Sequence, residues 1–221
     1  SKPGPRSLTL MAIAGHNGVP HNHNDIGSFI IHRGDKLWLN DPGGPVYNRK
    51  TFGPNRYDIV FCNSLGHSVP VVNGKLQQPG SRYRGTITVK GLNESGLKSA
   101  TIEMARAYPK GTVDRLIRTF SLDRDANKIT LADDYAFARK PRSLEEAFIT
   151  FEKVTVARGG RSVQIGPKGK GVPLSAVESG RFSLCAFREG SKEGRSGQTI
   201  QRITFVPRTL ERKMTLTFEI E

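Results

Sequence analysis

The chain has 221 residues, which is long enough for one sizeable hydrophobic core or for two small ones. Lysine and arginine number 34 against 20 aspartates and glutamates, so the formal net charge is +14 at pH 7. This excess favours a polyanionic partner, which can be a nucleic acid, an anionic membrane surface or an acidic polysaccharide. No apolar run approaches the roughly 18 residues of a membrane-spanning helix, which argues against a protein with such helices.

The two cysteines, Cys62 in "VFCNS" and Cys185 in "FSLCAF", both lie in apolar surroundings. Apolar surroundings predict buried free thiols rather than a disulfide. The chain starts at "SKPGPRS" without an initiator methionine or a signal peptide, which predicts a mature product or an excised piece.

Alternation of apolar and polar residues dominates the chain and predicts short strands with one apolar face. A hairpin is predicted around Arg33-Gly34-Asp35, and the pair Asn73-Gly74 predicts a tight hairpin turn. The clearest alternating segments are residues 7–14, 86–92, 128–137, 147–157, 181–187 and 214–221.

Helical periodicity is almost absent. The segment 143–148, "SLEEAF", could begin a helix, but the strand pattern that follows it favours a strand. The loop 166–171, "GPKGKG", resembles a phosphate-binding loop in spacing only, because the serine or threonine and the following helix are missing. The sequence therefore predicts an all-β fold, an antiparallel β-sandwich with almost no helix, and a single domain over 1–221.

The segment 15–29, "GHNGVPHNHNDIGSF", carries the chemistry. In an extended segment the side chains of His21 and His23 point to the same side, so that both imidazoles can converge on one ion. A zinc ion would need one or two further ligands, with Zn–N near ~2.0 Å. Asp41 in "WLNDPGGP" and His67 in "NSLGHSVP" are candidates because each lies beside turn residues, and Asp25 is a closer alternative.

Other interpretations of this segment stay open. A His-x-His pair can be a solvated loop, and we interpret His16 and His32 as structural or surface residues. Gly15 followed by His21 and His23 fits the first cupin motif, but the glutamate which that motif requires is missing from positions 26–29. Nucleic-acid binding would follow from the charge, but aromatic residues make up only 8% and lie mostly inside strand patterns, without a stacking platform.

Several linked motifs resemble one family. They are "GHNGVPHNHNDIGSF", the "DPG" turn, "KTF" followed by "RY", and the Ser-x-x-His of "SLGH", all within residues 8–85. Together they resemble the C-terminal β-sandwich (supersandwich-like) region of heparinase II/III-like polysaccharide lyases, whose members act on alginate, oligoalginate and glycosaminoglycans. Residues 86–221 resemble the family only in their strand pattern.

The resemblance implies a structural zinc ion held by His23, Asp41 and His67. It also implies that His21 faces the substrate and helps to neutralise a uronate carboxylate, while Asp25 orients a histidine or the loop. The reaction it implies is β-elimination from a uronate-containing acidic polysaccharide.

Among the local tyrosines, Tyr57 is the choice for a catalytic residue of the cleft, although packing is an alternative for both Tyr57 and Tyr47. Arg56 and Lys50 could contact an anionic sugar or could be ordinary surface residues. The resemblance further implies an N-terminal α/α toroid domain that supplies much of the catalytic machinery, so that the isolated chain would be weakly active or inactive. It implies a periplasmic or secreted location.

A second function fits the same residues. A non-catalytic, zinc-stabilised β-sandwich that binds carbohydrate would use the same ligands and the same positive charge.

Overall fold

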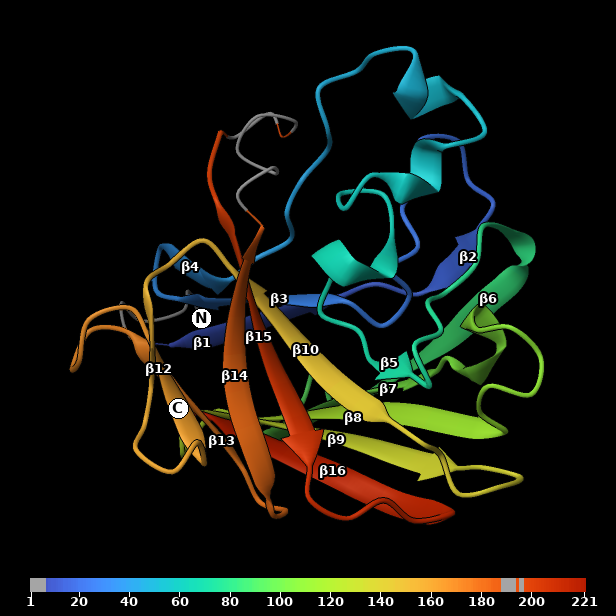
Figure 1. The fold of residues 1–221 in the computed structure, drawn as a ribbon. Helices are drawn as coiled ribbons and strands as arrows, with labels where there is room; N and C mark the ends of the chain where they lie inside the picture. Colours follow the sequence, from blue (N-terminus) through green and yellow to red (C-terminus); the bar gives the residue numbers. More distant parts are fainter. Residues whose placement is uncertain (1–6, 188–193, 195–196) are drawn as a thin grey trace.

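The computed structural model describes residues 7–187, 194 and 197–221 of the chain. The first six residues, where the sequence suggested processing, lie outside this part. The described part contains sixteen β-strands and four short 3-10 turns, and no α-helix (Figure 1). The predicted all-β class is confirmed. None of the helical segments in the described part is long and apolar enough to cross a bilayer.

The largest sheet is antiparallel and has nine strands. Its strands, in order across the sheet, are β11 (Val154–Val156), β12 (Ser162–Ile165), β13 (Val172–Ala176), β16 (Lys213–Ile220), β9 (Lys128–Ala136), β8 (Arg115–Asp123), β7 (Leu97–Glu103), β6 (Gly80–Lys90) and β2 (Gly15–Asn17).

Two smaller sheets complete the fold. A four-stranded sheet has the order β14 (Gly180–Phe187), β15 (Ile200–Pro207), β10 (Leu144–Thr150) and β5 (Val71–Val72), and a three-stranded sheet has the order β1 (Leu8–Ala12), β3 (Phe29–Arg33) and β4 (Lys36–Leu39).

Aromatic side chains join the four-stranded sheet to the nine-stranded sheet. The ring of Phe218 on β16 contacts the rings of Phe148 on β10 and Phe205 on β15, with centroid separations of 4.9 and 5.2 Å. Phe182 on β14 contacts Phe205 at 4.9 Å. These rings are buried, and they are the sandwich core that the alternating strands predicted.

The segment between β4 and β5 contains three of the 3-10 turns and stands above the sheets in Figure 1. These turns are η1 (Lys50–Phe52), η2 (Arg56–Asp58) and η3 (Ser64–Gly66). A fourth turn, η4 (Ala105–Ala107), follows β7. The cap over the sheets therefore consists mostly of irregular backbone, which carries the polar motifs of the sequence.

Both predicted turns are present. Gly34 has φ 62° between β3 and β4, and Asn73 and Gly74 have φ values of 51° and 70°. Two successive positive φ values are what a type I′ hairpin turn requires, and Asn-Gly adopts them at low cost.

One predicted strand is wrong in its extent. The segment 147–157 is divided, because β10 ends at Thr150 and β11 begins at Val154. The Thr150 hydroxyl donates to the carbonyl of Trp38 at 2.7 Å and accepts from the Glu152 amide at 3.0 Å, which turns the chain out of one sheet and into another.

The prediction for the thiols is correct for Cys62 and wrong for Cys185. Both cysteines are free, but Cys62 is buried and Cys185 is exposed. Cys185 lies three residues after the inward-facing Phe182 on β14, an edge strand, so its side chain points to the opposite face.

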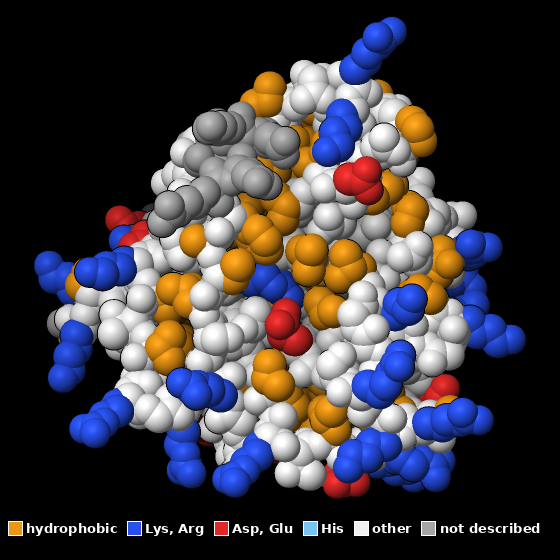
Figure 2. Space-filling view, in the orientation of Figure 1, with side chains coloured by type: hydrophobic (Ala, Val, Ile, Leu, Met, Phe, Trp, Pro, Cys, Tyr) orange, Lys and Arg blue, Asp and Glu red, His pale blue; other side chains and the backbone are white. Residues whose placement is uncertain are grey.

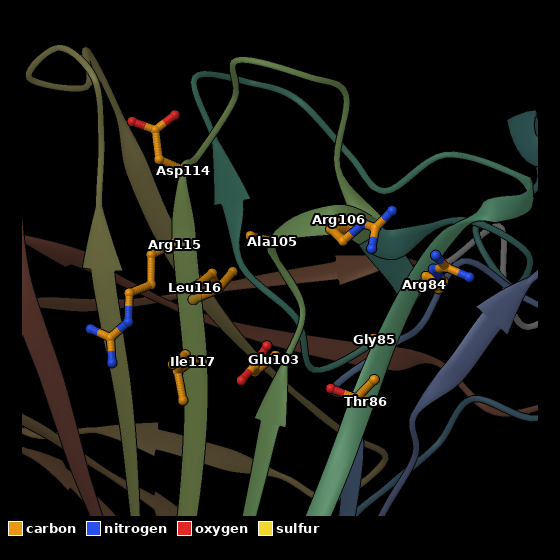
Figure 3. A pocket seen from close by; sticks show the side chains of 10 residues that line it. All are labelled: Arg84, Gly85, Thr86, Glu103, Ala105, Arg106, Asp114, Arg115, Leu116 and Ile117. Atoms are coloured by element: carbon orange, nitrogen blue, oxygen red, sulfur yellow. The ribbon is translucent and has the colours of Figure 1, made fainter.

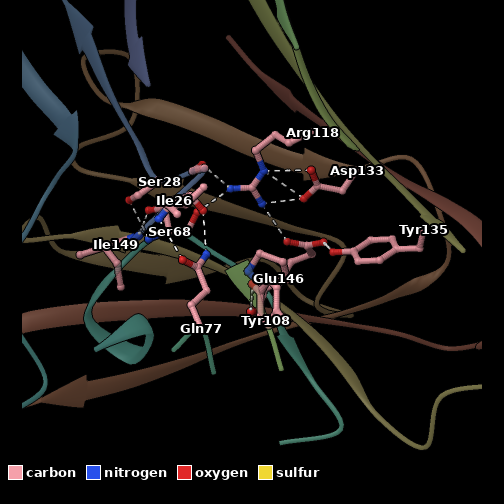
Figure 4. A network of polar contacts seen from close by, with 12 residues as sticks. Ile26, Ser28, Ser68, Gln77, Tyr108, Arg118, Asp133, Tyr135, Glu146 and Ile149 are labelled. Atoms are coloured by element: carbon pink, nitrogen blue, oxygen red, sulfur yellow. Dashed lines mark hydrogen bonds and ion pairs between the residues drawn. The ribbon is translucent and has the colours of Figure 1, made fainter. Parts of the chain in front are cut away.

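A buried ionic network lies between the two large sheets (Figure 4). Arg118 and Asp133 are direct cross-strand partners on β8 and β9, and Arg118 Nε donates to both Asp133 carboxylate oxygens, at 2.9 and 3.1 Å. Arg118 Nη2 also reaches Glu146 Oε2 on β10 at 3.2 Å, and Tyr135 donates its hydroxyl proton to Glu146 Oε1. Burial and then the Asp133 charge raise the pKa of Glu146 well above its usual range, so one guanidinium balances one carboxylate.

The same guanidinium holds two loops. Its Nη1 donates to the carbonyl of Gly27 at 2.8 Å and to the carbonyl of Ser68 at 2.6 Å. Gly27 lies in the histidine-rich segment 15–29, and Ser68 follows His67. Arg118 thus ties the sandwich core to both loops that carry the candidate site.

Replacing Arg118 by methionine removes every one of these bonds while keeping most of the side-chain volume. We expect the free energy of unfolding to fall by about 3–5 kcal/mol, because Asp133 is left buried and unpaired. Urea denaturation measures this change. The exposed Arg124→Met substitution is the matched control, with an expected change within about 0.5 kcal/mol. Equal effects of the two substitutions would contradict the role given to the network.

Candidate metal centre

The histidine-rich loop is held by buried polar contacts. Gln77 clamps Ile26 on both sides: its Oε1 accepts from the Ile26 amide at 3.0 Å and its Nε2 donates to the Ile26 carbonyl at 2.7 Å. The Ser64 hydroxyl donates to the carbonyl of Asn24 at 2.8 Å. These groups are buried, so the loop between His23 and Gly27 has a fixed backbone despite its lack of regular structure.

The loop that carries His67 is anchored in the same way. Asn63 caps the short turn η3 by accepting from the Leu65 amide at 2.9 Å. The Ser68 amide donates to Ser28 Oγ at 3.2 Å, and Ser68 Oγ accepts from the Ile149 amide at 3.0 Å. His67 is therefore fixed between the histidine-rich loop and β10, and its side chain is fully buried.

His23, Asp41 and His67 come together, although 44 residues separate the first from the last. Their ligand atoms all lie within 4.8 Å of one another. Nδ1 of His67 is 3.1 Å from Oδ2 of Asp41, and the rings of His23 and His67 have centroids 5.2 Å apart. Asp41 is oriented by the turn after β4, where its Oδ1 accepts from the Gly43 amide at 2.8 Å.

Hydrogen bonding sets the position of the proton on the His67 ring and the direction in which its pKa is shifted. Its Nε2 is 3.0 Å from the Phe61 carbonyl, which can only accept, so Nε2 carries a proton and Nδ1 faces Asp41. Burial opposes a charge on His67, but the hydrogen bond and the charge of Asp41 outweigh it and raise the pKa of His67. For Asp41, burial is the largest single effect and raises the pKa, but the hydrogen bond to His67, the charge of His67 and the hydrogen bond from the Gly43 amide together lower the pKa below its usual value.

His23 has the opposite character. Burial, followed by the charge of His67, lowers the pKa of His23 to about 4. At neutral pH the ring is therefore neutral, which is the form that binds metal ions.

These three residues fit a zinc ion in donor type and in spacing. A tetrahedral zinc ion with bonds of about 2.0–2.1 Å has neighbouring ligands about 3.3 Å apart, which is close to the His67–Asp41 distance of 3.1 Å. The hydrogen bond from Nε2 to Phe61 is the outer contact that metal-binding histidines commonly make. The zinc ion itself stays a prediction.

Asp25 lies beside this group. Its Oδ1 is buried and has no hydrogen-bond partner in the described part of the chain, and burial raises its pKa. Asp25 and Asp41 both line a cavity of about 300 Å³. An unsatisfied buried carboxylate oxygen at this position is one that a nearby cation would stabilise.

His21 does not share a point with His23, so the expectation from an extended His-x-His segment is wrong. His21 has φ 63°, which breaks the strand geometry and sends the two rings apart. The His21 ring is exposed and packs against Tyr47 and Phe52, with centroid separations of 5.8 Å to each. Arg56 fixes this turn, because its Nη2 donates to the His21 carbonyl at 3.0 Å.

The tyrosine next to His21 is Tyr47, and the sequence had favoured Tyr57. The hydroxyl of Tyr47 is 3.4 Å from Nδ1 of His21. Tyr57 is half-buried and packs against a small apolar cluster that includes Phe61 and Ile200. A signal for Tyr47 was present, since the "DPGGP" turn returns the chain toward the histidine-rich loop, but distance along the chain alone did not separate the two tyrosines. A catalytic role for Tyr57 stays a prediction.

The remaining histidines lie apart from the group. His16 is exposed on β2, where its Nδ1 accepts from the Gly18 amide at 3.2 Å, and His32 is half-buried on β3.

Comparison with known proteins gives a structural match. No protein-family model and no curated protein sequence matches the chain. Two heparinase III structures superimpose with TM-scores of 0.73 and 0.72, at 14% and 13% identity, over 98% of this chain and 33% of theirs. The heparan sulfate lyase HepC from Pedobacter heparinus matches with a TM-score of 0.70 at 14% identity, over 96% of this chain and 32% of its own.

The fold is that of one third of heparinase III. The resemblance seen in the sequence motifs is thus confirmed at the level of structure and extends to residues 86–221, where the sequence carried only a strand pattern. The chain spans about a third of the length of the lyases it matches.

The first prediction from this geometry concerns zinc. Replacing His23 by alanine removes one of three ligands, so we expect zinc affinity to fall at least about a hundredfold and the metal-dependent gain in thermal stability to disappear. Calorimetric titration of the metal-free protein with zinc measures the affinity. His16→Ala is the control and should bind zinc like the original protein. Unchanged zinc binding by His23→Ala would rule out the assigned ligand set.

A second prediction concerns pH in the metal-free protein. Between pH 6.5 and about 4 the unfolded chain protonates His23 while the folded chain does not, so the free energy of unfolding falls as the pH falls through this window. We expect His23→Gln to lose this part of the pH dependence. Urea denaturation at a series of pH values compares the two proteins, and parallel curves would contradict the lowered pKa.

Proposed function

We propose that this chain is a zinc-bound domain of a polysaccharide lyase that cleaves a uronate-containing acidic polysaccharide by β-elimination. The observation that carries the proposal is the pairing of two neighbouring features: a cluster of His23, Asp41 and His67 suited to a divalent ion, and an exposed imidazole, His21, on the same loop. The fold shared with heparinase III and with a heparan sulfate lyase supports it.

The chemistry requires help at the uronate carboxylate. A base removes the proton from the carbon that bears the carboxylate, and the 4-linked glycosidic oxygen leaves. Removing that proton adds charge to a group that is already anionic, so hydrogen-bond donors beside the carboxylate must stabilise the developing charge. In the proposed complex His21 supplies such a donor from the ring nitrogen that does not face Tyr47.

Neighbouring side chains define what His21 can do. Tyr47 approaches Nδ1 of His21, and no hydrogen bond is made by Nε2 within the described part of the chain, where the His21 side chain is exposed. The Arg56 guanidinium donates hydrogen bonds to the carbonyls of Thr51, His21 and Asn22. We therefore assign it to fixing the position of His21 rather than to binding sugar. The zinc ion, when bound, would brace the loop behind His21.

The remaining groups come from elsewhere in this proposal. Because the chain spans about a third of the matching lyases, we assign the catalytic base to a further domain, which the family resemblance describes as an N-terminal α/α toroid. Tyr57 stays the candidate for a second local catalytic residue.

One observation favours the alternative of a non-catalytic carbohydrate-binding domain. Tyr47 and Phe52 are 45% and 64% exposed and stand with His21 as an aromatic surface on which a sugar ring could stack. A domain of this kind would bind the polymer through the same residues without cleaving it.

Replacing His21 by alanine in the protein joined to the rest of its native chain separates the two functions. We expect the zinc content to be unchanged and the rate of elimination to fall at least about a hundredfold, as for the loss of a group that acts in the transition state. Ultraviolet absorbance of the unsaturated uronate product measures the rate, and elemental analysis measures zinc. His16→Ala is the control.

The outcomes are distinct. Loss of zinc together with activity would contradict the separation between His21 and the metal ligands. Absence of product from the unsubstituted protein on every uronate polymer tested would favour the binding domain.

A further inference from the structure

Three adjoining hollows lie at one end of the nine-stranded sheet. The first, of about 430 Å³, lies over the ends of β6, β7 and β8 (Figure 3). The second, of about 540 Å³, shares Arg106 and Asp114 with the first, and the third, of about 480 Å³, shares Gly111 with the second. Because neighbouring hollows share lining residues, we call the three together the depression, and none of its lining residues belongs to the candidate metal centre.

The lining of this depression is strongly basic. Its two acidic residues are Glu103 and Asp114. Two of its cations have acidic partners, since Arg115 pairs with Asp134 and Lys140 with Glu211. Six more make no ion pair within the described part of the chain, and we call these six the basic track: Arg82, Arg84, Arg106, Lys110, Arg139 and Arg142.

Backbone geometry concentrates these charges. Arg82 and Arg84 are two residues apart on β6, so both side chains leave the same face of the strand. The turn η4 packs against β6 and brings Arg106 to the same rim as Arg84, as Figure 3 shows. All six side chains are exposed, and Lys and Arg are also frequent along the right-hand edge of the molecule in Figure 2.

Unpaired guanidinium groups held side by side repel one another, and a bound oxyanion relieves this repulsion. Arginine also binds planar or tetrahedral oxyanions through two parallel hydrogen bonds, which suits sulfate and carboxylate groups. A single small anion would occupy one hollow, whereas three adjoining hollows with cations in each suit a linear polymer with repeated charges.

The lining favours a polysaccharide over a nucleic acid. Binding of single strands depends on exposed aromatic rings on which bases stack. Of the aromatic residues here, Tyr108 and Phe137 are buried, and Tyr83 is half-buried with the Arg82 guanidinium 4.9 Å from its ring. No open stacking surface is left in the three hollows, whereas charge and hydrogen-bond donors are plentiful.

The first hollow of the depression is in direct packing contact with the histidine-rich loop. β6 pairs with β2, which places Arg84 opposite His16. Gly85 on β6 lies so close to Ile26 that an added Cβ would be 2.6 Å from Ile26 Cγ2, which only glycine avoids. The strand that forms the floor of the first hollow is therefore also packed against the loop that carries His23.

We propose that the basic track is a binding site for a linear sulfated polysaccharide, separate from the site at which His21 would act. Binding at the basic track requires neither a metal ion nor catalysis, so this site goes beyond the proposed lyase function and does not depend on it. The track would hold a second stretch of an acidic polymer and raise its local concentration.

The test compares two double substitutions of equal charge. Arg84→Gln with Arg106→Gln removes two cations from the track, and Arg158→Gln with Arg161→Gln removes two exposed arginines from the turn between β11 and β12. Fluorescence anisotropy with a labelled, fully sulfated uronate octasaccharide measures affinity over a series of salt concentrations. All proteins also carry His21→Ala, so that no cleavage interferes.

We expect the track variant to bind about five- to tenfold more weakly at low salt and the control variant to bind like its parent. The slope of log affinity against log salt should fall by about one for each lost cation in the track variant only. Removing the sulfates from the octasaccharide should weaken binding to the parent and make the two variants alike.

Equal losses in the two double variants would overturn the proposal, since binding would then follow net charge alone. Desulfated oligosaccharide that binds as tightly as the sulfated one would overturn the choice of ligand. Single-stranded DNA that binds the parent more tightly, with the same dependence on Arg84 and Arg106, would replace the polysaccharide by a nucleic acid. None of these results bears on elimination, so the proposed lyase function is tested independently.

Discussion

The structure depends on one buried guanidinium. Arg118 satisfies Asp133 across neighbouring strands, reaches Glu146 on the facing sheet, and donates to the carbonyls of Gly27 and Ser68. A buried ion pair seldom adds much net stability, but the loss of one partner is costly, so such a network specifies one arrangement strongly. Here it fixes the positions of two irregular loops relative to the core.

The candidate metal centre follows from that constraint. The chain around His67 and the part of the histidine-rich segment between β2 and β3 are irregular backbone, and Gln77, Ser64 and Ser68 supply hydrogen bonds that hold them. Because both loops are fixed, burial can keep His23 neutral while Asp41 favours the charged form of His67. Two imidazoles and a carboxylate are a suitable donor set for one divalent ion, which would take the place of the proton between His67 and Asp41.

Two regions of the protein differ in the groups that they expose. Around His21, the Arg56 guanidinium donates to backbone carbonyls, and the exposed groups are an imidazole, a tyrosine and a phenylalanine. At the end of the nine-stranded sheet, six cations are left without acidic partners in the described part of the chain. Under the proposals made above, elimination would take place at the first region, and the second region would retain the polymer.

The sequence by itself determined the all-β class and the two hairpin turns, because alternation and the positive-φ residues of a turn are local properties. It indicated His23, Asp41 and His67 as a set only through the family resemblance, since the residue types alone left His21 and Asp25 open as ligands. Only the tertiary structure decided which buried charges meet, where the segment 147–157 divides, that Cys185 faces outward and that Tyr47 rather than Tyr57 lies beside His21. Each of these depends on contacts between residues far apart in the chain, and a single positive φ at His21 was enough to turn its ring away from His23.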